Sequence, residues 1–104
     1  MRERYEATRQ RLEEDAPEVL DAIRTAVNDV DPVHLMGFGA PDDEYDPEVT
    51  DLAEGLLSIG PDPEQLAAHA QEVFDRWFYP DCVSAETCRE IAARLCRVWI
   101  RLNN

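Results

Sequence analysis

Prolines and glycines divide this chain into segments of helical length, and within each segment the apolar residues recur every three or four positions. The clearest segment spans residues 63–78 and stops before Pro80, because a residue that precedes proline disfavours helical geometry. Its apolar positions are Leu66, Ala67, Ala70, Val73, Phe74, Trp77 and Phe78. No segment alternates apolar and polar residues as a half-buried β-strand does. The pattern therefore predicts an all-α fold.

The same spacing predicts a small helical bundle with four main helices, at about residues 16–30, 47–59, 63–78 and 85–102. Residues 2–14 carry few large apolar side chains, so this segment is either a polar first helix packed by one edge or a frayed arm, and we expect a helix. A long connection spans residues 31–46. Because 104 residues suffice for one core, residues 1–104 are expected to form a single helical domain.

Short polar signals mark where these helices are expected to begin. An Asp side chain can accept hydrogen bonds from the free amides of a first helical turn, and Pro at the next position loses nothing by lacking its own amide. Asp15 and Ser84 are further candidate caps, for the helices at 16–30 and 85–102. Three Asp-Pro pairs fit the description of a helix start: Asp31-Pro32, Asp46-Pro47 and Asp62-Pro63.

The charge of the chain is strongly uneven along its length. The formal net charge is -13, and residues 32–81 carry twelve acids and one arginine, whereas residues 82–104 carry two acids and four arginines. Phosphate contacts need a basic stripe, so we expect no direct nucleic-acid binding. The acidic middle of the chain instead favours a partner that is itself a basic protein.

Apolar runs and cysteines bear on the compartment. No apolar run approaches the roughly 20 residues needed to cross a bilayer, and none follows Met1 as a signal peptide would. Cys82, Cys88 and Cys96 are an odd number without a CxxC pair, which is typical of reduced thiols. We therefore expect a cytoplasmic protein that does not contact a membrane.

The sequence predicts no catalytic residue, no cofactor and no metal site. A calcium loop that began at Asp42 would place Pro47 where such a loop needs glycine, and neither histidine has zinc-finger spacing to the cysteines. Phosphate-binding loops, serine-hydrolase elbows and zinc-protease motifs are also missing. A non-enzyme is favoured, while a metal-dependent or thiol enzyme that uses the 31–46 loop stays open, with Cys82 as the most accessible thiol.

Acids gather around one tyrosine in "PDDEYDPEV", residues 41–49. Those in or near the following first helical turn interact favourably with the helix dipole. Those that precede the helix repel one another without a local cation, so they form either a solvated loop or a surface for a basic partner, to which the tyrosine adds apolar contact. The partner-binding residues that we expect are Asp42, Asp43, Glu44, Tyr45, Asp46, Glu48 and Asp51, together with Tyr79 beyond the helix at 63–78.

These motifs also carry a resemblance to known proteins. The pattern Asp-Pro-apolar, Pro-x-Asp-Glu-Tyr-Asp and Phe-x-x-Trp-Phe resembles that of a group of short bacterial all-helical proteins of unknown function, relatives of which occur among toxin-system immunity proteins. The match covers roughly residues 16–79, whereas His34 and the Arg-rich last helix depart from the pattern. The matching residues are Asp31, Pro32, Pro41, Asp43, Glu44, Tyr45, Asp46, Glu48, Phe74, Trp77 and Phe78.

The leading hypothesis for function is an acidic interaction module that associates with a basic protein surface under charge steering. The resemblance implies its specific form, an immunity protein that neutralises a bacterial toxin. Besides the enzyme, a second alternative is a helical DNA mimic, whose spaced carboxylates imitate phosphates. The mimic requires exposed acids on several helices rather than in one loop. The oligomeric state stays open.

Overall fold

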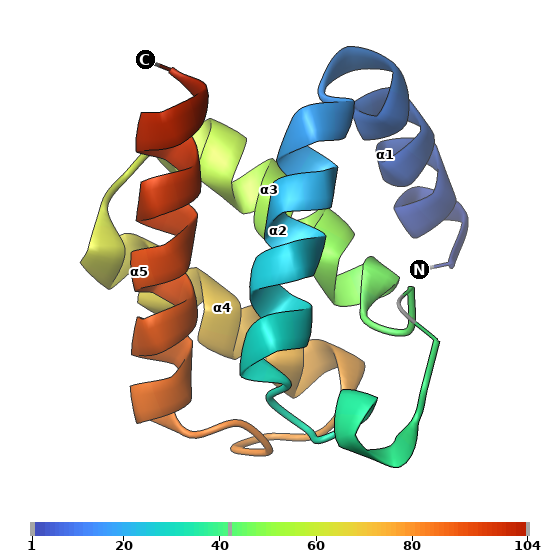
Figure 1. The fold of residues 1–104 in the computed structure, drawn as a ribbon, viewed down its shortest axis with the longest axis vertical. Helices are drawn as coiled ribbons and strands as arrows, with labels where there is room; N and C mark the ends of the chain where they lie inside the picture. The colour runs from blue at the N-terminus through green and yellow to red at the C-terminus, as the bar shows by residue number, and fades with distance from the viewer. Residues whose placement is uncertain (1, 42, 104) are drawn as a thin grey trace.

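Five α-helices and one short 3-10 helix account for most of the chain in a computed structural model, which describes residues 2–41 and 43–103 (Figure 1). The side chains of residues 2–4 and of Phe38 are not part of this description. No strand occurs among the described residues, so the predicted all-α bundle is confirmed, together with a helix at the N-terminus. The helices are α1 (Arg2–Asp15), α2 (Pro17–Val30), η1 (Met36–Phe38), α3 (Asp46–Ile59), α4 (Pro63–Trp77) and α5 (Ala85–Leu102).

The helices surround one apolar core. Figure 1 shows α2 and α5 side by side and antiparallel, with α3 and α4 behind them. α4 packs against α3 and α5, and α2 packs against the same two helices. Most residues of the predicted stripes face inward here, because burying them removes apolar surface from water, whereas Leu57 and Leu102 are exposed. The largest fully buried aliphatic and aromatic side chains include Phe74, Ile23, Leu52, Leu56, Leu66, Ile91 and Leu95.

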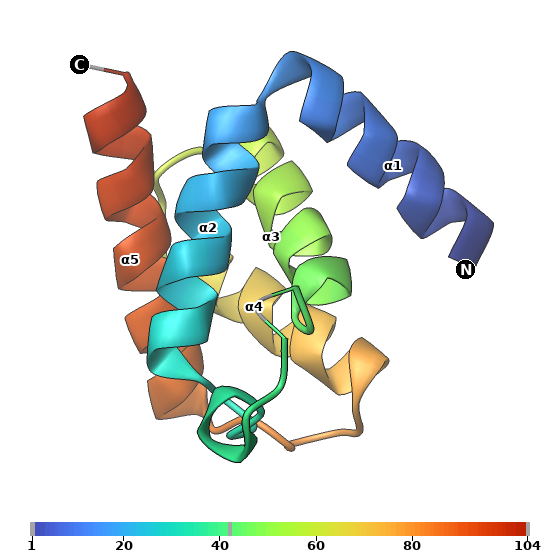
Figure 2. The ribbon, with the colours of Figure 1, turned by 45° about the vertical axis from the view of Figure 1, so that its right-hand side comes forward.

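α1 is a polar helix held by one edge. It lies against α2 and α3 at one side of the bundle (Figure 2). Leu12 is buried in the core, and the ring of Tyr5 meets that of Trp77 edge to face with centroids 5.9 Å apart. Of the two alternatives for residues 2–14, the structure therefore shows the helix packed by one edge rather than the frayed arm.

The three Asp-Pro pairs have three different roles. Asp62 is the predicted cap of α4, because its Oδ1 accepts hydrogen bonds from the amides of Glu64 and Gln65, both at 3.1 Å. Asp46 instead lies inside the first turn of α3, and its side chain does not cap the helix. Asp31 ends α2 in the left-handed conformation with φ of 52°, so its prediction as a helix start is wrong.

The two other predicted caps also have different outcomes. Ser84 caps α5, because its hydroxyl accepts a hydrogen bond from the Thr87 amide at 3.1 Å. Asp15 does not cap α2, since α1 extends as far as Asp15 and leaves Ala16 at the capping position without a side-chain hydrogen bond.

The structure also shows the state of the cysteines and the character of the helices. Within residues 2–41 and 43–103, no helix combines the length and the apolar character that crossing a membrane requires. The three cysteines are free thiols, with Cys88 buried and Cys82 and Cys96 half-buried. Burial raises the pKa of Cys88 to about 11, so this thiol is a poor nucleophile at neutral pH.

Candidate partner-binding site

A partly buried hydrogen-bond network closes the connection between α2 and α3. Asp31 Oδ1 accepts hydrogen bonds from the Tyr45 hydroxyl at 2.8 Å and the Met36 amide at 3.0 Å, and Asp31 Oδ2 accepts one from the Gly37 amide at 3.0 Å. The Tyr45 hydroxyl in turn accepts a hydrogen bond from the Val33 amide at 3.1 Å. Tyr45 is 0% exposed. It fixes the loop from inside and offers no surface to a partner, which corrects the role expected for it.

The ionisation of both groups suits this network. Burial raises the pKa of Tyr45 to about 12, so its hydroxyl keeps the proton that it donates to Asp31. Burial opposes the charge on Asp31, but hydrogen bonds from the Met36 amide, the Tyr45 hydroxyl and the Gly37 amide outweigh it and hold the pKa of that carboxyl below its usual value. The network is therefore a carboxylate surrounded by donors, and it stays charged at neutral pH.

The network predicts the effect of removing one oxygen. Tyr45→Phe is expected to lower the free energy of unfolding by about 1–3 kcal/mol, because the ring stays while the Asp31 carboxylate and the Val33 amide lose a partner. Denaturant unfolding of the variant and the wild type measures the difference. Tyr79→Phe is the matched control, since Tyr79 is exposed and its change is expected within about 0.5 kcal/mol. A Tyr45→Phe protein as stable as the wild type would show that the hydroxyl does not hold the loop.

Asp46 is a buried carboxylate paired with arginines from two other helices. Arg24 of α2 makes a two-point contact, with Nε 2.8 Å from Oδ1 and Nη2 3.1 Å from Oδ2. Arg9 of α1 places Nη2 3.2 Å from the same Oδ2. The Asp46 side chain is only 5% exposed. Its charge is neutralised inside the protein and joins α1, α2 and α3, so the expectation that Asp46 faces a partner is also corrected.

Glu48 is buried without comparable neutralisation. The residue is 4% exposed, and its Oε2 has no hydrogen-bond partner among the described residues. Burial raises the pKa of Glu48 to about 7, and the negative charges of Asp51, Glu44 and Asp46 act in the same direction. Near neutral pH this carboxyl therefore exchanges between a protonated and a charged form. Its burial removes it from the expected contact surface.

Asp51 is engaged by α4. Its Oδ2 accepts a hydrogen bond from the Trp77 indole N–H at 2.7 Å and lies 3.7 Å from Arg76 Nη1. Its backbone oxygen lies 2.9 Å from His69 Nε2, and Gly55 permits this approach because the His69 ring occupies the space that a Cβ would need. The adjoining cleft is lined by Tyr5, Thr8, Asp51, Glu54, His69, Arg76 and Trp77. Its volume of about 150 Å³ is small beside ordinary ligand pockets.

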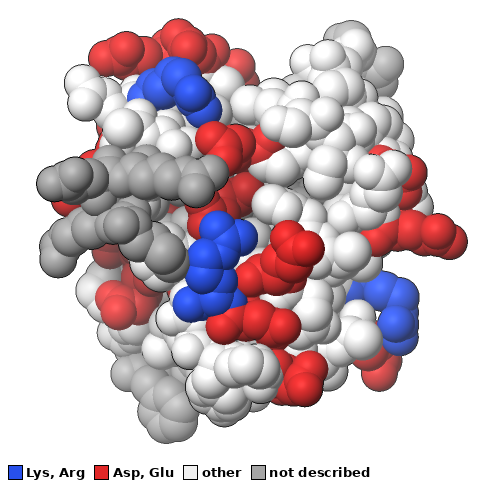
Figure 3. Space-filling view, turned by 180° about the vertical axis from the view of Figure 1, so that it is seen from behind, with Lys and Arg blue, Asp and Glu red and all other residues white. Residues whose placement is uncertain are grey.

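Three of the predicted partner-binding residues are exposed: Asp43, Glu44 and Tyr79, the last at 63%. Among the side chains that the structure describes, no arginine pairs with Asp43 or Glu44. Several other acids do pair with arginines, and Figure 3 shows one face on which arginine side chains lie directly beside acidic ones. Asp42, the remaining predicted residue, lies outside the described residues.

The exposed acids lie on a hydrogen-bonded turn. The Glu44 amide donates to the Pro41 carbonyl at 3.1 Å, and the Asp46 amide donates to the Asp43 carbonyl at 3.0 Å. The next residue along the chain is the buried Tyr45. The positions of Asp43 and Glu44 are therefore set by backbone hydrogen bonds and by the side chains that follow them.

Arg9 and Arg24 were not among the residues predicted for the site, although the sequence places both beside apolar stripes. Arg24 is the only base in α2 and lies beside the apolar stripe, four residues after Leu20. Arg9 shares an edge of α1 with Tyr5 and Leu12, four residues after one and three before the other. A single arginine at the margin of an apolar stripe, as Arg24 is in α2, is a candidate partner for a buried acid, because a buried charge needs a partner.

A known sequence family covers most of the residues of this site. The family described as Domain of unknown function (DUF1871) matches residues 22–100. The chain belongs to this family. The DUF1871 region includes the Asp31–Tyr45 network together with Arg24 and Asp46, whereas Arg9 lies before it. No curated protein and no solved structure matches the chain significantly.

The DUF1871 match supports a resemblance to short proteins of unknown function, and its description carries no activity with it. Within the part of the chain that the structure describes, no group of three or more His, Cys, Asp or Glu side chains is placed to hold a metal ion.

Proposed function

We propose that this DUF1871 protein is an acidic interaction module that binds a basic protein surface through the turn bearing Asp43 and Glu44. The supporting observation is the contrast between neighbouring acids. Asp46 is neutralised by Arg24 and Arg9, whereas Asp43 and Glu44 are exposed without a described arginine partner. Adjacent unpaired carboxylates repel one another, and a basic partner would relieve that repulsion.

The hydrogen bonds that flank Asp43 and Glu44 favour this use. Binding costs conformational entropy when a loop must be ordered, and a loop that is already ordered avoids much of that cost. Here the Tyr45 hydroxyl and Asp31 hold the connection from inside, and backbone hydrogen bonds fix the turn itself. Tyr79 is a further exposed aromatic side chain of the kind that partner surfaces use.

The partner that we propose is a basic domain of a bacterial toxin, which would make this chain an immunity protein. The sequence resemblance to immunity proteins supports this choice. The mechanism is association accelerated by opposite charge, followed by covering of the basic site of the toxin. A neighbouring gene is where the toxin would be encoded, so its product is the partner to test.

Removing the exposed charges is expected to slow association. Asp43→Asn combined with Glu44→Gln should lower the association rate constant with that gene product by about tenfold at low salt, and by less as salt screens the charges. Surface-immobilised kinetics at several salt concentrations measures the effect. Glu72→Gln combined with Glu86→Gln removes the same charge from exposed positions on α4 and α5 and serves as the matched control. An absence of binding by the gene product, or association unchanged by salt and by the first pair, would overturn the proposal.

A DNA mimic is the second candidate function, because exposed carboxylates also occur outside the turn. They lie on several helices, at positions that include Glu13, Asp21, Glu64 and Glu90. The same pair of variants separates the two candidates. A mimic of phosphates distributes its contacts along a row, so the control pair should weaken binding about as much as the Asp43 and Glu44 pair, and DNA should compete with the chain for the partner.

A further inference from the structure

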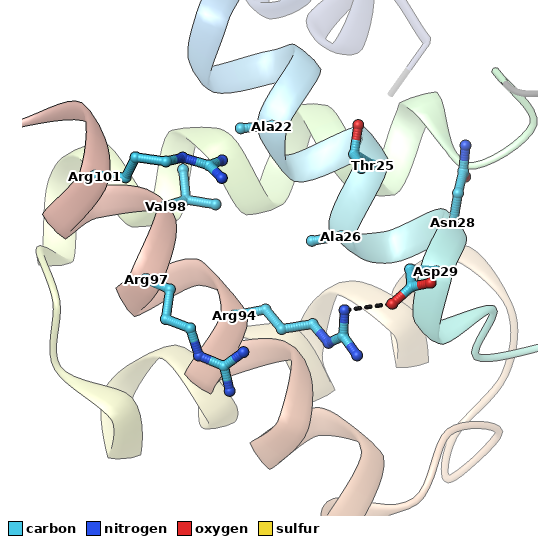
Figure 4. A pocket seen from close by; sticks show the side chains of 9 residues that line it. All are labelled: Ala22, Thr25, Ala26, Asn28, Asp29, Arg94, Arg97, Val98 and Arg101. Carbon is cyan, nitrogen blue, oxygen red and sulfur yellow. Dashed lines mark hydrogen bonds and ion pairs between the residues drawn. The ribbon is translucent and has the colours of Figure 1, made fainter.

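A groove between α2 and α5 is lined by cations on a chain that is acidic as a whole. It encloses about 550 Å³. Figure 4 shows three arginines of α5, Arg94, Arg97 and Arg101, on one side of the groove and small side chains of α2 on the other. Ala22, Thr25, Ala26, Asn28 and Asp29 form the α2 wall, and the largely buried Val98 lies at the floor between the arginines.

The arginines form a row along the helix. They are spaced three and four residues apart, so they share one face of α5 and extend over about 10 Å of its axis. Arg94 is anchored by two acids, with Nη1 2.6 Å from Asp29 Oδ2 and Nη2 3.7 Å from Glu90 Oε1, yet its Nε is buried without an acceptor among the described residues. Arg97 and Arg101 are exposed, and no acid within residues 2–41 and 43–103 pairs with either.

We propose that this groove binds an acidic amphipathic helix from a partner protein. A helix lying along the groove could place carboxylates four residues apart opposite Arg97 and Arg101, and Arg-carboxylate pairs form two parallel hydrogen bonds. The small side chains of the α2 wall leave room for the partner backbone to approach. Apolar side chains of the partner would then contact the half-buried Ala22 and Ala26 of the α2 wall.

The geometry favours a helix over a small anion. A phosphate group is held by donors that converge on one point, whereas these guanidinium groups are distributed along two turns of α5. In Figure 4, Arg101 extends toward Ala22 while Arg94 extends toward Asp29, so the outer two arginines reach α2 at different heights. An extended row of this kind matches a linear partner.

The overall negative charge does not prevent such binding. At about 0.15 M salt, charges more than about 8 Å apart are largely screened, so the partner responds mainly to the arginines beside it. The groove is also separate from the turn of Asp43 and Glu44. Charge changes at the turn should therefore leave groove binding unchanged, and the two proposals can fail independently.

The test uses three probes and nitrogen-15 NMR of the full chain at physiological salt. The first probe is a synthetic amphipathic helix of about 18 residues with glutamates every third or fourth position along one face and leucines beside them. The second replaces every glutamate with glutamine, and the third is inorganic pyrophosphate. We expect the glutamate peptide alone to shift amides of residues 22–29 and 94–101. Arg97→Gln combined with Arg101→Gln should weaken its binding at least about tenfold.

Arg89→Gln is the matched control, since Arg89 is exposed on another face of α5 and does not line this groove. Amide spectra of the variants establish that each is folded. The proposal is overturned if the glutamine peptide binds as tightly as the glutamate peptide, if the Arg97 and Arg101 pair changes nothing, or if the peptide causes no shifts. Shifts caused by pyrophosphate and not by the peptide would instead assign a small-anion site and would equally overturn the helix proposal.

Discussion

Asp46→Asn is expected to lower the free energy of unfolding by about 2–3 kcal/mol, because the buried Asp46 loses its charge while Arg24 and Arg9 stay partly solvated. The neutral amide cannot balance Arg24, which contacts both carboxylate oxygens of Asp46, or Arg9, which contacts one of them. Because Asp46, Arg24 and Arg9 join three helices, the loss of stability should appear in one cooperative unfolding transition. Denaturant unfolding followed by circular dichroism measures it.

The control lies three residues earlier in the chain. Asp43→Asn removes the same charge from an exposed position, and its effect on stability is expected within about 0.5 kcal/mol. The contrast between the two variants matters more than either value. Equal small effects would mean that Asp46 is solvated, and that α1 and α2 do not bring their arginines to it.

Glu48→Gln is expected to stabilise the protein, by an amount that depends on pH. In the folded chain the pKa of Glu48 is about 7, above its ordinary value of 4.5. Between these two values unfolding releases a proton, so stability falls as pH rises through this window. Above about pH 7 both states are ionised and the full cost of burying the charge remains, whereas below about pH 4.5 both are protonated and there is no cost.

Glutamine has the shape of glutamate without the charge, so the variant should escape this penalty. We expect it to be about 2–3 kcal/mol more stable than the wild type near pH 8, and about equally stable near pH 4.5. Denaturant unfolding at several pH values measures both limits. Glu72→Gln, at an exposed position, is the control for a general effect of net charge. A Glu48→Gln protein that gains nothing at pH 8 would contradict the buried position of Glu48.

The fold could be predicted from local patterns, because the apolar spacing and the helix-stopping residues are local. The helix predicted at 85–102 is α5 at the same bounds, and the one at 63–78 differs from α4 by one residue. Asp62 caps as expected because its hydrogen bonds reach only two and three residues along the chain.

The predicted site could not be resolved in the same way, since its interactions are long-range in sequence. Asp46 meets an arginine 22 residues earlier, and Tyr45 donates to a carboxylate 14 residues earlier. The local pattern of residues 41–49 does not distinguish an acid that pairs with a distant arginine from an acid that has no arginine partner. The sequence therefore located the acidic cluster and could not tell which of its members are buried.

The acidic cluster therefore consists of buried residues and exposed residues. Tyr45, Asp46 and Glu48 hold the connection and the start of α3 from inside, and Asp43 and Glu44 are presented by them. The exposed acids of the described cluster are thereby limited to a short turn. The α2–α5 groove, with its row of arginines, offers a second surface of opposite charge.

A carbon-13 NMR titration of the side-chain carboxyls tests most directly whether the acids at the start of α3 are internal. Each carboxyl reports its own midpoint under conditions in which the protein stays folded. The Glu48 carboxyl is expected to titrate at about pH 7, because burial and the neighbouring acids raise its pKa, and Asp31 is expected to titrate below its usual value. A Glu48 midpoint near its ordinary value of 4.5 would show a carboxyl in water and would contradict a buried acidic cluster.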